Sequence, residues 1–257
     1  MRAVCAIWRR ELLSFFVSPI AYFVIAGFGL IGGFFFFNLL AYYNVVIDRV
    51  SAMPWAANQA PSINQWVGEQ YFQTLLIILV FLIPLITMRT IAEERRRGTF
   101  ELLATSPISV ADIVLGKFLG VASVVLAMIL MASVFPLLLI VFFEPEIPPL
   151  LAGICGVSVF GVGCAAVGLA VSSYTENQIV AGVSSMVVLL LLYVIHAPAE
   201  AMGGGVIASI LSYLSPALQV QDILKGVISV KAIVYFLSLI ALGLFLSFRA
   251  IEAHRWR

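Results

Sequence analysis

The sequence predicts an all-α membrane protein with six transmembrane helices, and three observations carry this prediction. Hydrophobic residues make up 63% of the 257 residues and charged residues only 11%, whereas soluble domains carry roughly a quarter of their residues as charges. The mean hydropathy is +1.12. The apolar residues also come in long runs, without the periodicity that half-buried strands or helices of a soluble protein display. Lipid is therefore the solvent that this composition requires.

Six runs are long enough to cross the hydrocarbon core of a bilayer, which takes about 20 mostly apolar residues in a helix. We expect these spans at residues 18–42, 71–88, 113–143, 150–173, 179–195 and 232–248. Lys117 is the one Asp, Glu, Lys or Arg residue within them. Because it lies near the start of the third span, we expect its amine to reach the inner membrane surface. The whole chain, residues 1–257, is predicted to be one transmembrane domain.

The Lys and Arg residues predict the orientation. Eleven of them lie on the side that holds both chain termini and the connection between spans two and three, and three lie on the other side. Cytoplasmic segments of membrane proteins carry an excess of Lys and Arg. We therefore expect a multi-pass protein with both termini in the cytoplasm, as an even number of crossings requires.

The first residues predict an N-terminal interfacial helix along the inner leaflet. Trp8 belongs to an apolar face of this helix, whereas Arg9 and Arg10 lie away from that face. Glu11 falls within the apolar face, where a carboxylate needs a cationic partner. We expect that partner in the next basic cluster, which begins at Arg89.

The connection between spans two and three predicts a short cytoplasmic helix. Gly98 can end the helix that leaves the membrane, and Thr99 can cap a new one. Glu101 then lies in the first turn, where negative charge suits the helix dipole, and Pro107 follows its end. Ser109, three residues before Asp112, has the capping-box spacing that opens the third span.

This predicted helix, about two turns long, is suited to docking a soluble partner. Phe100 gives it an apolar tip, and the charges of residues 93–97 flank it. The alternative is that the arginines only anchor the chain by the positive-inside rule. That alternative leaves the paired Glu93 and Glu94, the capped helix and the exposed phenylalanine unexplained.

Two further segments matter for the architecture. Residues 196–231 are too apolar for a free loop and too interrupted for two crossings, so we expect re-entrant outer helices before span six. Span four is rich in glycine and alanine, which let helices approach closely in lipid. Packing within one chain and packing between two chains are both open for this span.

The chain resembles the type-2 ABC exporter permeases, which form the membrane half of ATP-driven transporters. The residues that carry the resemblance are Glu93-Glu94-Arg95-Arg96-Arg97-Gly98-Thr99-Phe100-Glu101-Leu102-Leu103, Ser106-Pro107-Ile108-Ser109 and Gly116-Lys117. Arg9-Arg10-Glu11-Leu12, the six spans and the outer helices also fit this family. Within it, residues 11–22 and 32–37 are similar to the gliding-motility-associated permeases.

The resemblance implies a division of labour in the bacterial inner membrane. The sequence has no phosphate-binding loop, since Gly116-Lys117 is followed by Phe118 and lacks the upstream glycine. The chain would bind no cofactor itself, and ATP-Mg would lie on a separate cytoplasmic ATPase subunit. A second permease, identical or related, would complete the complex, with an outer-face or periplasmic subunit possible and no nucleic acid involved. The implied ATPase contacts are Glu93, Glu94, Arg95, Arg96, Thr99, Phe100 and Glu101.

Two other classes of protein are weighed against this interpretation. An ion-coupled secondary transporter or channel usually places ionisable groups inside the membrane, and these spans hold almost none. An intramembrane enzyme needs converging nucleophile, base or metal ligands, and the spans offer no such set. The sequence leaves the cargo open: it fits lipids, an amphipathic export substrate, or purely mechanical work on an outer partner.

Overall fold

The computed structural model describes residues 2–52, 62–96, 98, 109–143, 145–201, 205–227 and 229–255. Within these ranges the chain forms helices and their connections, and no strand. Six helical stretches are long and apolar enough to cross a membrane, which confirms the predicted fold class. They are Pro19–Ser51, Asn64–Arg96, Val110–Phe142, Ile147–Ser173, Gln178–Ala199 and Val230–Ala253.

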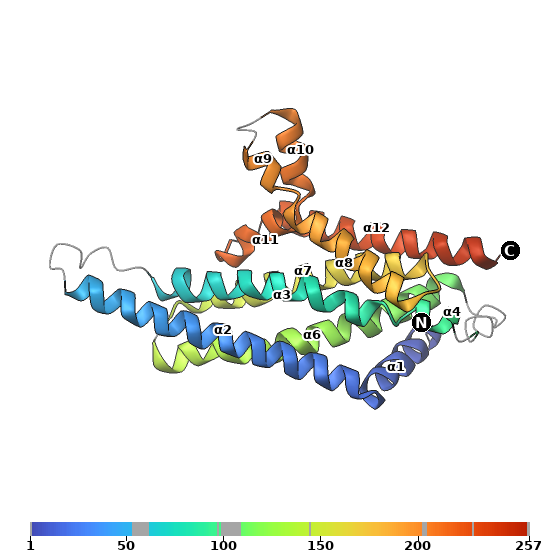
Figure 1. Ribbon diagram of the computed structural model, residues 1–257, viewed down its shortest axis with the longest axis horizontal. Coiled ribbons are helices and arrows are strands. Elements are labelled where there is room, and N and C mark those ends of the chain that lie inside the picture. The colour runs from blue at the N-terminus through green and yellow to red at the C-terminus, as the bar shows by residue number, and fades with distance from the viewer. Residues whose placement is uncertain are drawn as a thin grey trace.

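The helices of these stretches run side by side along the long axis of the molecule (Figure 1). They are α2 (Pro19–Ser51), α3 (Gln70–Thr87, preceded by the π-helix η2, Asn64–Glu69), α6 (Val110–Phe142), α7 (Ile147–Ser173), α8 (Gln178–Val194) and α12 (Val230–Arg255). α2 continues to Ser51, well beyond the expected end of span one at Tyr42. Hydropathy reports where apolar side chains end, whereas a helix continues as long as its backbone hydrogen bonds do.

The remaining helices lie at the two ends of these stretches. α1 (Arg2–Val17) meets α2 at Ser18, whose hydroxyl caps α2 by accepting a hydrogen bond from the Ile20 N–H. Between α8 and α12 are α9 (Ala197–Ala201), α10 (Val206–Leu214) and α11 (Pro216–Leu224). α11 packs on α7, while α9 and α10 stand away from the bundle (Figure 1). The segment predicted to be re-entrant is thus three short helices.

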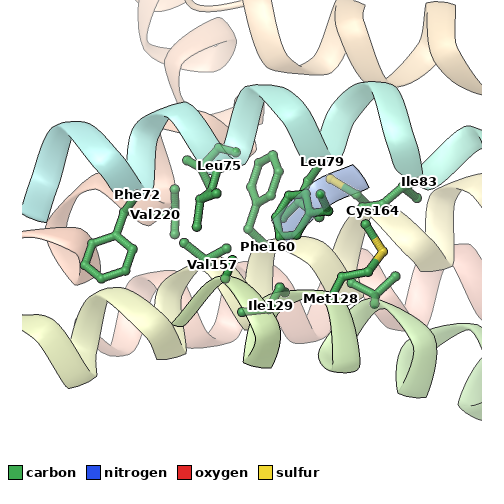
Figure 2. Packing of buried hydrophobic residues seen from close by; sticks show 14 of the residues in the cluster. Phe72, Leu75, Leu79, Ile83, Met128, Ile129, Val157, Phe160, Cys164 and Val220 are labelled. Carbon is green, nitrogen blue, oxygen red and sulfur yellow. The ribbon is translucent and has the colours of Figure 1, made fainter. Parts of the chain in front are cut away.

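α7 is the centre of the bundle and contacts α3, α6, α8, α11 and α12. Figure 2 shows side chains of α3, α6 and α7 that point toward one another, among them Leu79, Met128 and Phe160. The small residues of α7 allow this packing. A methyl group at Gly153 would lie 2.1 Å from the Phe72 ring, and one at Gly163 would lie 3.1 Å from Phe236. These glycines therefore serve packing within the chain, the first of the two possibilities left open by the sequence.

A proline within α6 is compensated by α3. Pro136 has no N–H, so the carbonyl of Ala132, four residues earlier, loses its helical donor. The hydroxyl of the fully buried Tyr71 donates a hydrogen bond of 2.9 Å to this carbonyl. In the apolar interior an unpaired carbonyl is costly, so this contact fixes α3 against α6.

A double-mutant cycle should measure this contact. We expect Tyr71→Phe to lower the free energy of unfolding by about 1–3 kcal/mol, because it leaves a buried carbonyl without a donor. In a Pro136→Ala background the restored N–H of residue 136 can bond to Ala132, so the same change should cost clearly less. Unfolding followed in detergent micelles gives both values. Equal costs in the two backgrounds would contradict the pairing.

Candidate functional site

The described site residues predicted from the sequence lie on two helices, α1 and α4, at one end of the bundle. Glu93, Glu94, Arg95 and Arg96 form most of α4 (Ala92–Arg96). Trp8, Arg9, Arg10 and Glu11 lie on α1. Thr99, Phe100 and Glu101, with the short helix predicted around residues 99–105, lie outside the described residues. Figure 1 places α1 and α4 close together, at the end of the bundle where α12 also ends.

One local and one long-range hydrogen bond hold the turn from α3 into α4. The Thr90 hydroxyl donates to the Thr87 carbonyl at 2.7 Å, and the Ala92 N–H donates to the Ser172 hydroxyl of α7 at 3.4 Å. Gly98 has a φ of +70°, which side chains disfavour. Its N–H bonds to the Arg95 carbonyl. Gly98 therefore follows the end of α4, whereas α3, the helix that Gly98 was predicted to end, already ends at Thr87.

The start of α6 is fixed by the predicted cap. The Ser109 hydroxyl oxygen accepts a hydrogen bond of 3.1 Å from the Asp112 N–H. The same hydroxyl donates to the Asp112 carboxylate at 2.7 Å. Both ends of the connection between spans two and three are thus fixed: α4 by local contacts and a bond to α7, and the start of α6 by the Ser109 cap.

Lys117 is the centre of the site, and the prediction for it is wrong. Its side chain is fully buried within the protein, whereas the prediction required an amine that reaches water. The amine donates to the Thr90 carbonyl at 2.7 Å, and it lies 3.0 Å from Glu11 and 2.7 Å from Glu94. A lysine ammonium has three donors, so three acceptors from α1, the α3–α4 turn and α4 satisfy it.

Arg10 completes this group from the outside. Its guanidinium binds Glu94 and lies 3.1 Å from Glu11. We call Arg10, Glu11, Glu94 and Lys117 the Lys117 cluster. It contains two positive and two negative charges, so it is neutral as a unit. Glu11 therefore has cationic partners as expected, Lys117 and Arg10.

α1 lies on α6 through two glycines that flank Lys117. A methyl group at Gly116 would lie 2.7 Å from Ile7, and one at Gly120 would lie 2.8 Å from Cβ of Glu11. The Trp8 indole N–H donates to the Ser123 hydroxyl at 3.0 Å. The Gly116–Gly120 spacing is that of close helix contacts in membranes. This spacing is the sequence signal that could have identified Lys117 as a contact residue.

The other predicted residues divide by exposure. Glu93 binds Arg89, four residues earlier, with 2.9 Å between Arg89 Nε and Glu93 Oε2. Arg95 is partly buried, whereas Arg96 and Arg9 are exposed. The two carboxylates of α4 are therefore engaged within the chain, and Arg96 is the α4 side chain presented to the surroundings.

Two comparisons with known proteins bear on the identity of this chain. A search of curated protein sequences gives no match. The family model described as "ABC-2 family transporter protein" matches residues 43–249, which is most of the chain. The matched segment includes Glu94 and Lys117 but begins after α1. With six apolar helices long enough to cross a membrane, the chain belongs to the ABC-2 transporter family and is a multi-pass membrane permease.

Proposed function

We propose that this permease converts ATP hydrolysis by a separate cytoplasmic ATPase subunit into movement of its membrane helices, for export or for mechanical work on an outer partner. The chain would lie in the bacterial inner membrane as a single domain with both termini in the cytoplasm. ATP-Mg would bind to the ATPase, and a second permease would complete the complex. The similarity to the gliding-motility subgroup is part of this proposal and leaves the cargo open.

The observation that carries the proposal is the position of Glu94. It lies just before the segment proposed to dock on the ATPase, residues 99–105. Its carboxylate binds Lys117 of α6 and Arg10 of α1. A force on the docking segment would therefore act on α4, and through Glu94 on two further helices at once. Ionic contacts in a buried site resist separation, because breaking them leaves uncompensated charge.

The packing around the cluster extends the same linkage. α1 and α6 touch through Gly116 and Gly120. Ala92 of α4 bonds to Ser172 at the end of α7, the central helix. Packed helices move as rigid bodies and do not deform continuously. A displacement of α4 is thus expected to tilt α6 and α7 relative to the rest of the bundle.

The alternative of an ion-coupled secondary transporter or channel is weaker. Lys117 is the ionisable residue that such a mechanism would use, because membrane carriers place proton or ion relays on buried charges. Its three donors, however, are taken up by Thr90, Glu11 and Glu94. This arrangement suits a fixed joint better than a site that releases ions in each cycle.

Two changes test the docking segment. We expect Arg96→Glu combined with Phe100→Asp to reduce co-purification of the ATPase subunit by about tenfold or more. Phe100 is the proposed apolar anchor of the contact, and the charge of Arg96 would help to orient it, so the double variant loses both contributions. The purified permease alone should not hydrolyse ATP. Charge reversal at Glu93 and Glu94 should also release the ATPase, but these residues hold internal ion pairs, so their loss also disturbs the permease.

Arg249→Glu is the matched control for this test. Arg249 lies on α12 with 63% of its side chain exposed, and it pairs only locally with Glu252 in the described contacts. This variant should retain the ATPase. Full retention of the ATPase by the Arg96→Glu/Phe100→Asp variant would refute the docking site. Transport in vesicles that an ion gradient drives without ATP would favour the carrier class.

A further inference from the structure

A cavity of about 530 Å³ with charged and apolar side chains in its wall lies at the elbow between α1 and α2, facing the α3–α4 turn. The charged and hydroxyl side chains that matter here are Arg10, Ser14, Ser18, Arg89, Glu93 and Glu94. The cavity includes Glu93 and Glu94, which are also among the predicted ATPase contacts. Its two guanidiniums and its carboxylates make it suited to a ligand that carries both charges.

The cationic part of the cavity is held in place by its neighbours. Arg89 Nε lies 2.9 Å from the Glu93 carboxylate, and Arg89 Nη1 donates to the Ser18 hydroxyl at 3.3 Å. A guanidinium has five N–H donors in a planar fork that matches phosphate. Arg89 can therefore keep both contacts and still donate to a phosphate oxygen. Arg10, with half of its side chain exposed, lies in the same cavity wall.

The carboxylates of Glu93 and Glu94 can accept a donor from a ligand beside the donors that they bind within the chain. An ionised carboxylate has about four acceptor sites on its two oxygens. Glu93 and Glu94 therefore do not have to give up Arg89, Arg10 or Lys117 to accept a primary ammonium group. The ammonium group and the phosphate would then lie in the same cavity. A zwitterionic headgroup carries both groups close together.

The surroundings of the cavity indicate where this ligand comes from. Val17 lines the cavity and is 83% exposed, and nearby Phe23 on α2 is 84% exposed. In a chain that crosses the membrane, exposed apolar side chains of this kind face lipid tails. A cavity with charged groups beside an exposed apolar surface matches a phospholipid. The headgroup would lie in the cavity, and the acyl tails would lie along the apolar surface.

The charge balance selects the type of headgroup. In the ion pairs that the structure describes at the cavity, Arg10, Arg89 and the adjoining Lys117 pair with the three carboxylates of Glu11, Glu93 and Glu94. A headgroup without net charge preserves this balance, whereas an anionic headgroup adds an uncompensated negative charge. A choline group has no N–H to donate to the carboxylates, and an ethanolamine ammonium has three. We infer that the cavity binds a phospholipid with a primary-amine headgroup, such as phosphatidylethanolamine, as a resident lipid.

The test measures lipid binding by the purified, delipidated full chain with native mass spectrometry. The probes are phosphatidylethanolamine, phosphatidylglycerol, phosphatidylcholine and the tail-less glycerophosphoethanolamine. We expect phosphatidylethanolamine to bind about tenfold more tightly than each of the other three. Equal binding of phosphatidylglycerol would overturn the recognition of the amine. Equal binding of glycerophosphoethanolamine would overturn the lipid as the source of the ligand.

Two variants locate the site. Arg89→Gln removes the phosphate donor, and Ser14→Phe fills the cavity without changing any charge, so each should weaken phosphatidylethanolamine binding about tenfold. Ser14 is exposed, and its replacement should leave the unliganded protein folded. Arg249→Gln, at an exposed arginine of α12, should bind the lipid as the unaltered chain does. Unchanged binding in the Ser14→Phe variant would overturn the site. No ATPase is needed, so the result is independent of the proposed coupling.

Discussion

Lys117→Met is expected to lower the free energy of unfolding by about 3–5 kcal/mol, the cost of removing one partner from a buried ion pair. Methionine fills similar space, so the loss reports charge and hydrogen bonding and not volume. Without Lys117, the carboxylates of Glu11 and Glu94 have only Arg10 within the cluster, and the Thr90 carbonyl loses its donor. Thermal unfolding in detergent micelles measures the change.

Two companion variants separate this effect from a general effect of losing a lysine. Lys225→Met, at an exposed lysine after α11, should leave the melting temperature nearly unchanged. Glu11→Gln added to Lys117→Met restores the neutral charge of the cluster, so the double variant should be more stable than Lys117→Met alone. The cluster is not a stabilising unit if Lys117→Met melts like Lys225→Met.

Gly243→Ala should also be strongly destabilising, although it adds only one methyl group. Gly243 of α12 faces the backbone of α7, and a Cβ there would lie 2.7 Å from the Ala166 carbonyl oxygen. A backbone atom cannot rotate away as a side chain can. The added methyl group would therefore push α12 away from α7 at a position where the two helices are in close contact. Overpacking of this kind costs about 1–3 kcal/mol, and we expect the upper part of that range.

Gly27→Ala is the matched control, since both glycines lie inside transmembrane helices. No atom lies within 4 Å of the position that a Cβ would take at Gly27. The same methyl group should therefore be tolerated there, and alanine also favours the helix over glycine. Thermal unfolding in the same detergent compares the two. If both variants melt alike, close backbone approach does not limit the α7–α12 contact.

The sequence was sufficient to predict the six membrane-crossing helices. It also sufficed to predict the residues at the two ends of the connection between α3 and α6. Hydropathy sums over neighbouring residues, so apolar runs identify the spans without knowledge of the fold. Gly98 after α4 and Ser109 before α6 act on N–H and carbonyl groups a few residues away. Such local interactions are encoded in consecutive residues, which is why their prediction was correct.

Only the tertiary structure decided which distant partners the buried polar residues bind. The sequence indicated that Glu11 needs a cation, but it did not identify Lys117, 106 residues further along. It likewise left open which helices the glycines of α7 face, and it did not pair Tyr71 with the carbonyl freed by Pro136. These contacts depend on which faces of distant helices meet. In lipid, where hydrophobicity does not distinguish one helix face from another, shape and polar pairing make that choice.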